Sequence, residues 1–216
     1  MNRPAMFSTR TRSRRQGLTL TELMVTLVVA AVLLAISVPS MRELIARKRV
    51  EGVANELASD LRYLRSEAIQ RHAGSLQVNF GIAAQPSTCY AVVTLGSILT
   101  STQCNCALAA PPICADAFGM TLKELKTVML PGSTGITLTA SSALMALSSA
   151  GLPQYPSVNN PIASAAGAIL LVSVQSPRGG KVCVAANGAA RPTLCSVSGH
   201  EGTMPACPSL PAPCQA

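Results

Sequence analysis

The feature that most constrains this chain is an apolar run near its N-terminus that begins directly after an acid. From Leu23 to Met41 there are 19 residues without a charge, enough for a helix to cross a bilayer. Glu22 stands at the edge of this run, and a charge at the centre of a bilayer costs about 2.5–3.5 kcal/mol on insertion scales. The run therefore indicates a membrane anchor or an export signal, and Glu22 requires an explanation.

The residues ahead of the apolar run are basic. Five arginines and no acid precede Gly17: Arg3, Arg10, Arg12, Arg14 and Arg15. The whole chain has a formal charge of +8, but without these five its 12 Lys and Arg residues face 9 Asp and Glu residues, a net of +3. Most of the excess positive charge thus belongs to a leader, residues 1–17, rather than to a nucleic-acid surface.

Three kinds of N-terminal segment fit a basic leader followed by an apolar run. A secretory signal would be cut after residues 35–37, Ala-Ile-Ser, so that the mature protein begins at Val38. A single-pass anchor explains the length of the run but not Glu22. The third kind is cut after Gly17, ahead of the run, and keeps the apolar helix in the mature protein.

The sequence GLTLTE, residues 17–22, resembles the class III leader of type IV pilins and pseudopilins. In that leader a glycine is followed by a hydrophobic residue, usually Phe, then by three further residues and a glutamate. Gly17, Leu18 and Glu22 match this spacing, with Leu18 in place of Phe, and Pro39 lies where such proteins often have a helix-bending proline. The resemblance implies cleavage after Gly17 by a prepilin peptidase and N-methylation of Leu18.

The resemblance also implies a role for Glu22. Cleavage creates a new amino terminus at Leu18, and in pilin-like filaments the glutamate pairs with the terminal amine of a neighbouring subunit during docking. This pairing, together with a place near the membrane interface, reduces the cost of holding the carboxylate in lipid. The alternative is that Glu22 only snorkels into the headgroups.

Helical periodicity continues beyond the apolar run. Apolar residues recur every three or four positions at Val50, Ala54, Leu57, Leu61, Leu64 and Ala68. A helix from Leu18 to His72 would be about 80 Å long, with a kink at Pro39 and a stop at Gly74. The stripe predicts that the outer half of the helix packs on a sheet. Residues 57–71 are also similar to the GspH/FimT branch of minor pilins and pseudopilins.

After Gly74 the pattern changes to short alternating or buried apolar runs. Six runs predict strands, at residues 75–81, 89–95, 126–132, 135–140, 168–175 and 181–188. Residues 141–167, rich in Ala and Ser, predict a loop with short elements. The expected fold class is α+β, a pilin-like lollipop in which one long helix packs on an antiparallel β-sheet domain with disulfides.

The expected division of the chain follows these patterns. Residues 18–39 form the transmembrane and assembly half of the helix, and residues 40–73 form its amphipathic half. Residues 74–200 form a β-rich globular domain, followed by a tail rich in Pro and Cys at residues 201–216.

All eight cysteines follow the apolar run, which indicates an oxidising compartment such as a periplasm. They are Cys89, Cys104, Cys106, Cys114, Cys183, Cys195, Cys207 and Cys214. The alternative is a set of free thiols in a cytosolic protein. Short loops favour Cys183–Cys195 and Cys89–Cys104 as pairs, and the tail is closed either by Cys207 and Cys214 or by a link to the domain. With the leader arginines, the cysteines predict a single-pass inner-membrane protein whose domain is periplasmic.

Few residues could support catalysis. The two histidines are His72, at the expected helix end, and His200, among Gly and Ser residues. Residues 104–114 contain three cysteines, but no histidine or second CxxC completes a zinc set. No phosphate-binding loop or nucleophile elbow occurs. We therefore expect no enzymatic activity, cofactor or metal, and an exported enzyme is a distant third hypothesis.

DNA binding is a further hypothesis. The FimT branch is implicated in binding DNA for natural transformation through a C-terminal motif similar to Gly-Arg-x-Arg. Gly188 and Arg191 match two of its positions, but Ala189 stands in place of the first arginine. Arg178 and Lys181 could compensate in one patch with Arg191, because backbone binding requires positive charge rather than a fixed register. The alternative is a solvated loop that only carries a disulfide.

The resemblance implies a minor type IV pilin of the FimT type, incorporated near the tip of a filament. The alternative is a type II secretion pseudopilin of the GspH type. The expected partners are other pilins or pseudopilins, the prepilin peptidase and the inner membrane, with DNA as a possible additional partner.

Overall fold

The computed structural model describes ten parts of the chain. They are residues 17, 19–71, 76–80, 86–94, 103–105, 112–115, 123–154, 168–197, 204–208 and 210–215. The chain divides into two compact units, Met1–Met41 and Arg42–Ala216, and each is described by itself.

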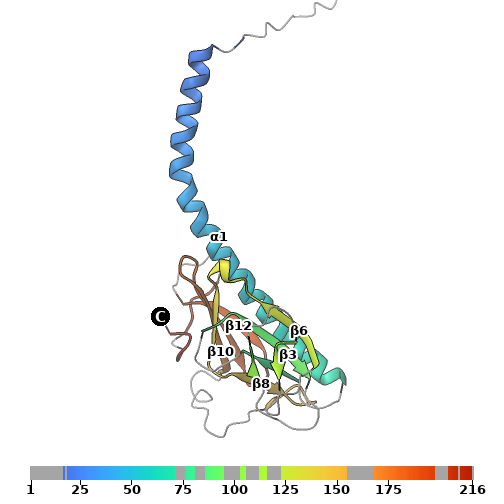
Figure 1. Cartoon of the computed structure of the whole chain (residues 1–216). Coiled ribbons are helices and arrows are strands. Elements are labelled where there is room, and N and C mark those ends of the chain that lie inside the picture. The colour runs from blue at the N-terminus through green and yellow to red at the C-terminus, as the bar shows by residue number, and fades with distance from the viewer. Residues whose placement is uncertain are drawn as a thin grey trace, which may run out of the picture. The chain divides into compact units, whose positions relative to one another are not determined.

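Helix α1 spans Leu20–Arg71 and contains both the apolar run and the amphipathic segment (Figure 1). In the first unit its large apolar side chains are exposed from Leu20 to Ile36. Among the described residues, α1 is the one helix long and apolar enough to cross a membrane. A helix that is apolar on all sides needs lipid or other helices to cover it.

The part of α1 that belongs to the second unit carries the predicted apolar stripe. Val50, Ala54, Leu57, Leu61, Leu64 and Ala68 are each at most 1% exposed. This confirms that the outer half of the helix packs on the β domain, as Figure 1 shows.

The domain contains two five-stranded sheets, and within each sheet neighbouring strands pair in antiparallel fashion. The first sheet has the order β6 (Lys123–Met129), β3 (Cys89–Thr94), β1 (Leu76–Asn79), β8 (Leu144–Leu147) and β9 (Pro153–Gln154). The second has the order β12 (Pro192–Ser196), β11 (Gly180–Asn187), β10 (Ala168–Ser176), β7 (Thr137–Ala140) and β2 (Pro86–Ser87). A two-stranded sheet joins β4 (Gln103–Cys104) to β5 (Cys114–Ala115), and a 3-10 turn, η1, spans Gly132–Thr134.

Both large sheets place alternate side chains in one core with the helix stripe. Tyr90 and Val92 of β3 and Val172 and Val174 of β10 belong to this core. Their sequence neighbours point to the opposite faces, as the two-residue period of a strand requires. The core therefore lies between three surfaces: one face of the helix and one face of each sheet.

The opposite faces of the two sheets are covered by disulfide-bonded segments. On the first sheet, Ile113 and Cys114 of the β4–β5 segment pack on Cys89, Ala91 and Val93 of β3. On the second sheet, Leu210 and Cys214 of the tail pack on Leu171, Cys183 and Cys195. These small clusters bury apolar faces that the long helix does not reach.

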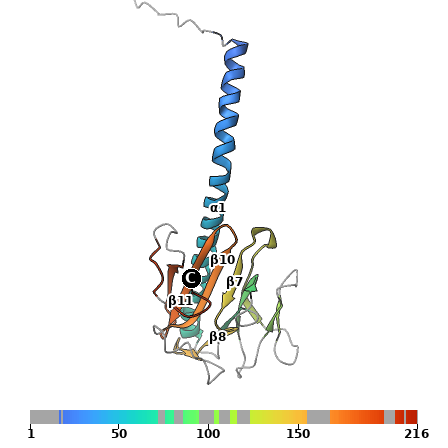
Figure 2. The ribbon, with the colours of Figure 1, turned by 90° about the vertical axis from the view of Figure 1, so that its left-hand side faces the viewer.

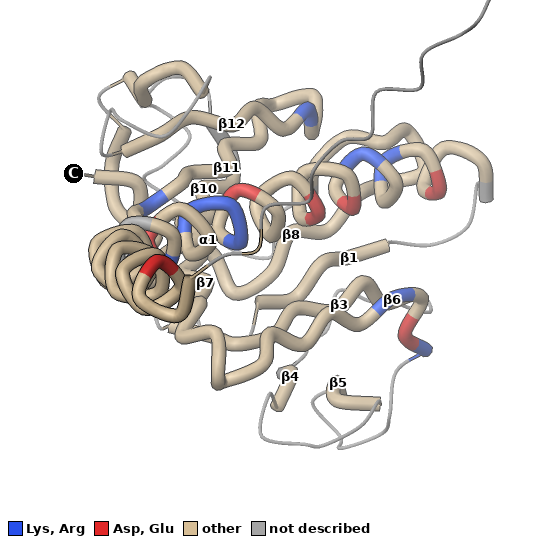
Figure 3. The backbone as a smooth tube through the Cα atoms, turned by 90° about the horizontal axis from the view of Figure 1, so that it is seen from above, with Lys and Arg blue, Asp and Glu red and all other residues tan. Residues whose placement is uncertain are grey.

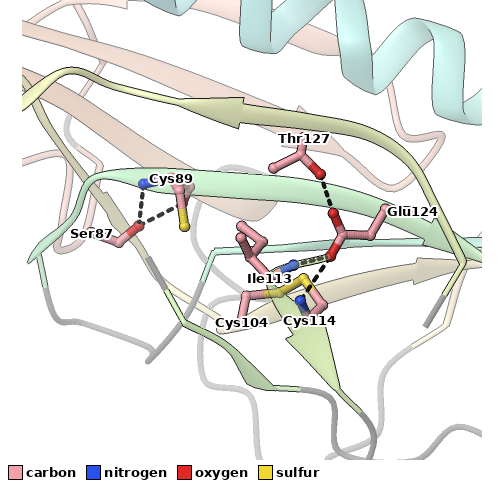
Figure 4. Close-up of a disulfide and its surroundings, with 7 residues drawn as sticks. All are labelled: Ser87, Cys89, Cys104, Ile113, Cys114, Glu124 and Thr127. Atoms are coloured by element: carbon pink, nitrogen blue, oxygen red, sulfur yellow. Dashed lines mark hydrogen bonds between the residues drawn. A yellow bond between two sulfur atoms is a disulfide. The ribbon is translucent and has the colours of Figure 1, made fainter. Parts of the chain in front are cut away.

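Glu124 attaches the β4–β5 segment to the first sheet (Figure 4). Its Oε1 accepts hydrogen bonds from the backbone N–H groups of Ile113 and Cys114, at 2.6 and 2.7 Å. Its Oε2 accepts a hydrogen bond from the Thr127 hydroxyl. One carboxylate on edge strand β6 thus satisfies three donors, two of them from a segment outside the sheet.

The six predicted strands correspond to β1, β3, β6, β7, β10 and β11, although β6 begins earlier than predicted. Six further strands of the described residues were not predicted, and four of them, β2, β4, β5 and β9, are only two residues long. Strand β8 lies within residues 141–167, and its four residues are all buried, so it has no polar alternation to reveal it. Strand β12 begins at Pro192, and a proline there is compatible with its place at the sheet edge.

The cysteines of the described residues are disulfide-bonded, but both predicted pairs are wrong. The bonds are Cys104–Cys114, Cys183–Cys214 and Cys195–Cys207. Cys89 is also disulfide-bonded, and Cys106 lies outside the described residues. Cys183 and Cys195 are cross-strand neighbours, yet each bonds to the tail because the tail packs on their face of the sheet. Of the two predicted closures of the tail, the link to the domain is the one observed.

Candidate functional site

The predicted cleavage site lies just ahead of α1. Gly17 is exposed and precedes the helix, and no atom lies within 4 Å of the position that a Cβ would take there. Leu18 lies outside the described residues. A peptidase must reach an extended backbone, and an exposed glycine before the first helical turn meets that requirement.

The start of α1 has a side-chain cap, Thr19, that the sequence analysis missed. The backbone N–H of Glu22 donates a hydrogen bond to the Thr19 hydroxyl at 3.2 Å. Thr19 and Glu22 have the spacing of a capping box, and an acid in the first turn interacts favourably with the helix dipole. The Thr-x-x-Glu pattern in the sequence could have predicted this cap. Glu22 is exposed, so its carboxylate is accessible to a partner as well.

Pro39 lies inside α1, whose helical backbone continues through this position. Its side chain is not described. The kink expected at Pro39 therefore stays a prediction, as do the predictions for His72 and His200, which lie outside the described residues.

The residues predicted to bind DNA do not form one patch. Figure 2 shows β10 and β11 side by side. Arg178 lies in the turn that joins these strands, and Lys181, just after the turn, is the cross-strand partner of Gln175. Gly188 and Arg191 lie beyond the other end of β11. Six strand residues, 182–187, lie between Lys181 and Gly188 and separate the two pairs by about 20 Å. The predicted single patch is wrong, because β11 is extended between them.

Arg178 belongs to a group of three arginines that we term the proximal basic cluster: Arg42, Arg49 and Arg178. These arginines line a cavity of about 510 Å³ together with residues 132–135 of the η1 turn. Lys181 is close by in sequence, but its Nζ donates a hydrogen bond to the Gln215 carbonyl at 2.6 Å. Lys181 thus holds the tail and does not line this cavity.

Arg191 belongs to a second group of three arginines that we term the distal basic cluster: Arg62, Arg65 and Arg191. These arginines line a second cavity, of about 580 Å³. The Asn187 side chain shapes the turn: its Oδ1 accepts hydrogen bonds from the N–H groups of Ala189 and Arg191, both at 3.0 Å. Basic and acidic segments are interspersed along α1 (Figure 3), so neither cluster follows from the sequence of the helix alone.

A buried carboxylate, Asp60, connects α1 to the first sheet. It is 6% exposed and accepts hydrogen bonds from the Tyr90 hydroxyl at 2.7 Å and from Lys126 Nζ at 2.8 Å. Lys126 also donates to Glu56 at 3.1 Å. Burial raises the pKa of Tyr90, and the hydrogen bond and negative charge of Asp60 raise it further. Burial lowers the pKa of Lys126, but its bonds to Asp60 and Glu56 outweigh this and raise it overall.

A family model of the prokaryotic N-terminal methylation motif matches residues 12–38. The chain carries a prepilin-type methylation signal. The match includes Gly17, Leu18 and Glu22 and most of the apolar run, and it ends before the globular domain. It confirms the N-terminal signal that the sequence predicted, while the roles of single residues within it stay predictions.

Comparisons of the rest of the chain give weaker results. No curated protein sequence matches the chain significantly. Two crystal forms of the type IV minor pilin FimU from Pseudomonas aeruginosa PAO1 are similar to it in structure. One is 13% identical with a TM-score of 0.43 and covers 68% of this chain and 89% of FimU. The other is 14% identical with a TM-score of 0.40 and covers 67% and 90%.

The sulfur atoms of Cys183, Cys195 and Cys207 lie within 4.8 Å of one another. This grouping arises because two disulfides, Cys183–Cys214 and Cys195–Cys207, are adjacent. Metal ligation by cysteine requires a thiolate. The grouping is therefore explained by the attachment of the tail.

Proposed function

We propose that this chain is a minor type IV pilin, a structural subunit of a filament. A prepilin peptidase cuts it after Gly17, Leu18 is methylated, and the apolar half of α1 holds the subunit in the inner membrane. The disulfide-bonded domain lies in the periplasm, and the subunit joins other pilins near the filament tip. Its function is assembly and contact rather than catalysis.

The methylation signal carries this proposal, together with the helix that follows it. Between Leu20 and Ile36 the large apolar side chains of α1 are exposed. Lipid covers such a helix before assembly, and a bundle of other helices can cover it afterwards. An export signal that is removed would leave no use for an apolar segment of this length joined to the core helix of the domain.

Glu22 supplies the electrostatic part of the assembly step. Its carboxylate stays close to the membrane boundary and pairs with the Leu18 amine of an adjacent subunit. A charge in lipid is costly, so each subunit gains when the two opposite charges meet in the filament. The same residue also occupies the capping-box position of α1, which gives it a second role that the experiment must separate.

The state of the mature N-terminus tests the retention of the apolar helix. We expect intact mass and N-terminal sequencing of the membrane-extracted protein to show methylated Leu18. A mature protein that begins at Val38 contradicts the proposal.

Three variants test the role of Glu22 in docking. Glu22→Gln keeps a side chain that can complete a capping box but removes the charge, and Glu22→Ala removes both. We expect both variants to remain in the membrane and to be lost from sheared filaments, whereas Glu43→Ala, an exposed acid further along α1, is incorporated normally. Normal incorporation of Glu22→Gln would mean that the residue acts only as a cap.

The proposal also selects the pilus over type II secretion, following the resemblance to the FimT rather than the GspH type. Deletion of the gene in the source organism separates the two. We expect loss of DNA uptake with normal release of secreted proteins. Loss of secretion with normal uptake would assign the subunit to the secretion pseudopilus.

DNA binding is a second candidate function, and the distal basic cluster favours it. Arg191, the residue of the predicted motif that is present here, lies with Arg62 and Arg65 around one cavity. Phosphate contacts of this kind make affinity fall steeply with salt. We expect Arg62→Gln/Arg191→Gln to weaken binding of duplex DNA and to reduce its salt dependence, while the same substitutions at Arg49 and Arg178 have little effect. Binding that is insensitive to salt would reject this candidate.

A further inference from the structure

The proximal basic cluster brings together arginines from two distant parts of the chain. Arg42 and Arg49 lie seven residues apart on α1 and therefore share a face of the helix. Arg178 lies in the β10–β11 turn, and the three line one cavity of about 510 Å³. All three belong to the same compact unit, Arg42–Ala216.

Gly179 explains how the turn reaches the helix. A Cβ at this position would lie 2.6 Å from the backbone oxygen of Ala46 and 3.0 Å from a methyl group of Val50. The turn therefore touches the backbone of α1, which is possible only without a side chain. This contact sets Arg178 beside the two helical arginines before any ligand binds.

Within the part of the chain that the structure describes, no acid pairs with the arginines of this cluster. Elsewhere on this stretch of α1, Arg47 pairs with Glu43, and Lys48 pairs with Glu51 at 2.7 Å. For Arg42, Arg49 and Arg178, no ion pair or hydrogen bond of the side chain is found among the described residues. The residues that line the cavity include no acid. Three guanidinium groups around one cavity favour an anion, and a phosphate offers the oxygens that arginine binds in pairs.

Chain connectivity places this cluster at a membrane boundary. Arg42 directly follows the charge-free run that ends at Met41. Arg49 is seven residues further, about 10 Å along a helix. The headgroup layer on each side of the hydrocarbon core is about 5–8 Å thick, so Arg42 lies at the depth of lipid phosphates. The backbone of Arg49 lies just beyond that layer, from which its long side chain can reach back to it.

We propose that Arg42, Arg49 and Arg178 bind the phosphate of an anionic phospholipid headgroup. The inference rests on the proposed function only in that the apolar helix must be retained in the mature protein. The site would hold the globular domain against the membrane surface while the subunit waits for assembly. Leaving the membrane for the filament then requires release of this lipid.

Lipid retention by the full-length mature protein tests the site. The protein is equilibrated in mixed micelles that contain equal amounts of phosphatidylglycerol and phosphatidylcholine, and bound lipids are counted by native mass spectrometry. We expect phosphatidylglycerol to be retained over phosphatidylcholine by about 10-fold, and Arg49→Gln/Arg178→Gln to lose this preference. The matched control, Arg62→Gln/Arg191→Gln, removes the same charge from the distal basic cluster and should keep it.

A second variant keeps the test independent of folding. Arg49→Lys preserves the charge on an exposed helix position but removes the paired donors of the guanidinium, so we expect a partial loss of the preference. Equal losses in the proximal double variant and in the distal control would mean that only net charge matters. An unchanged preference in the proximal double variant would overturn the proposal outright.

Competition identifies the source of the phosphate. We expect neither millimolar inorganic phosphate nor a short DNA duplex to displace phosphatidylglycerol. Displacement by inorganic phosphate would assign the cavity to a free anion, and displacement by DNA would assign it to nucleic acid; either result overturns the lipid site. The intact mass of the same sample separates the two proposals. A start at Val38 rejects the proposed function, whereas a methylated Leu18 without lipid preference rejects only this site.

Discussion

Among single residues, Asp60 stands out because it is a buried carboxylate that connects helix α1 to the first sheet. Its two oxygens accept from Tyr90 and Lys126, which lie on β3 and β6. A buried carboxylate is tolerated only when its oxygens are paired. The three residues together fix the position of α1 on the first sheet.

We expect Asp60→Asn to lower the free energy of unfolding by about 1–3 kcal/mol, because the Tyr90 hydroxyl and Lys126 lose their charged acceptor. The control is Glu56→Gln, which removes the exposed partner of the same lysine and should cost less than about 1 kcal/mol. Urea unfolding of both variants gives the comparison. Equal costs would show that burial of Asp60 adds nothing.

The raised pKa values of Tyr90 and Lys126 predict a loss of stability at alkaline pH. The folded protein keeps both protons more tightly than the unfolded chain, so their stabilisation is complete below the unfolded pKa values, 10.0 and 10.5. It is lost as the pH rises through the folded pKa values. We expect the urea midpoint to fall above about pH 10, and to fall less steeply in Tyr90→Phe. A Tyr90→Phe variant with the same pH profile as the wild type would contradict this account.

At the scale of the element, the contact between the β10–β11 turn and α1 depends on a single glycine. Gly179 has no space for a Cβ because the Ala46 carbonyl oxygen would lie 2.6 Å away. Backbone, unlike a flexible side chain, cannot move aside without shifting the helix or the turn. This position therefore controls how closely the second sheet approaches the helix.

We expect Gly179→Ala to destabilise the protein by about 1–3 kcal/mol through overpacking. Gly52→Ala makes the same change on α1, where the glycine is exposed and no atom lies within 4 Å of the added Cβ. There alanine should stabilise by about 0.5–1 kcal/mol because it favours helix. Thermal unfolding of both variants measures the sign of each change. Destabilisation by Gly52→Ala as well would mean that the loss at Gly179 is not explained by overpacking.

Over the molecule as a whole, disulfides compensate for a shortage of aromatic side chains. Aromatic residues make up only 3% of the sequence, and two small clusters cover the sheet faces away from α1. The tail also pairs with the edge of β12, where the Ser196 N–H donates to the Pro205 carbonyl at 2.8 Å. Covering that edge protects the sheet from pairing with another chain.

We expect removal of either tail disulfide to cost about 2–4 kcal/mol, and more for the bond that closes the longer loop. Cys183–Cys214 closes 31 residues and Cys195–Cys207 closes 12. Cys183→Ser/Cys214→Ser should therefore have the lower urea midpoint and should expose Leu210 and Leu171 to an apolar dye. A lower midpoint for the Cys195→Ser/Cys207→Ser variant would contradict the loop argument.

Features that depend on the spacing of neighbouring residues could be predicted before the fold was known. The stripe from Val50 to Ala68 follows from the 3.6-residue period of a helix, and strands such as β3 and β10 follow from short apolar runs between turn residues. The N-terminal methylation motif at residues 12–38 is local for the same reason, because it is a pattern of neighbouring residues.

Contacts between residues far apart in the chain could not be predicted and depend on how the segments pack. Cys183 bonds to Cys214 rather than to Cys195 because the tail packs on the outer face of the second sheet. Arg178 joins Arg42 and Arg49, and Arg191 is separated from it by the length of β11. Such groupings depend on strand register and on the approach of sheet to helix, which arise from packing between segments far apart in the chain and not from the spacing within any one of them.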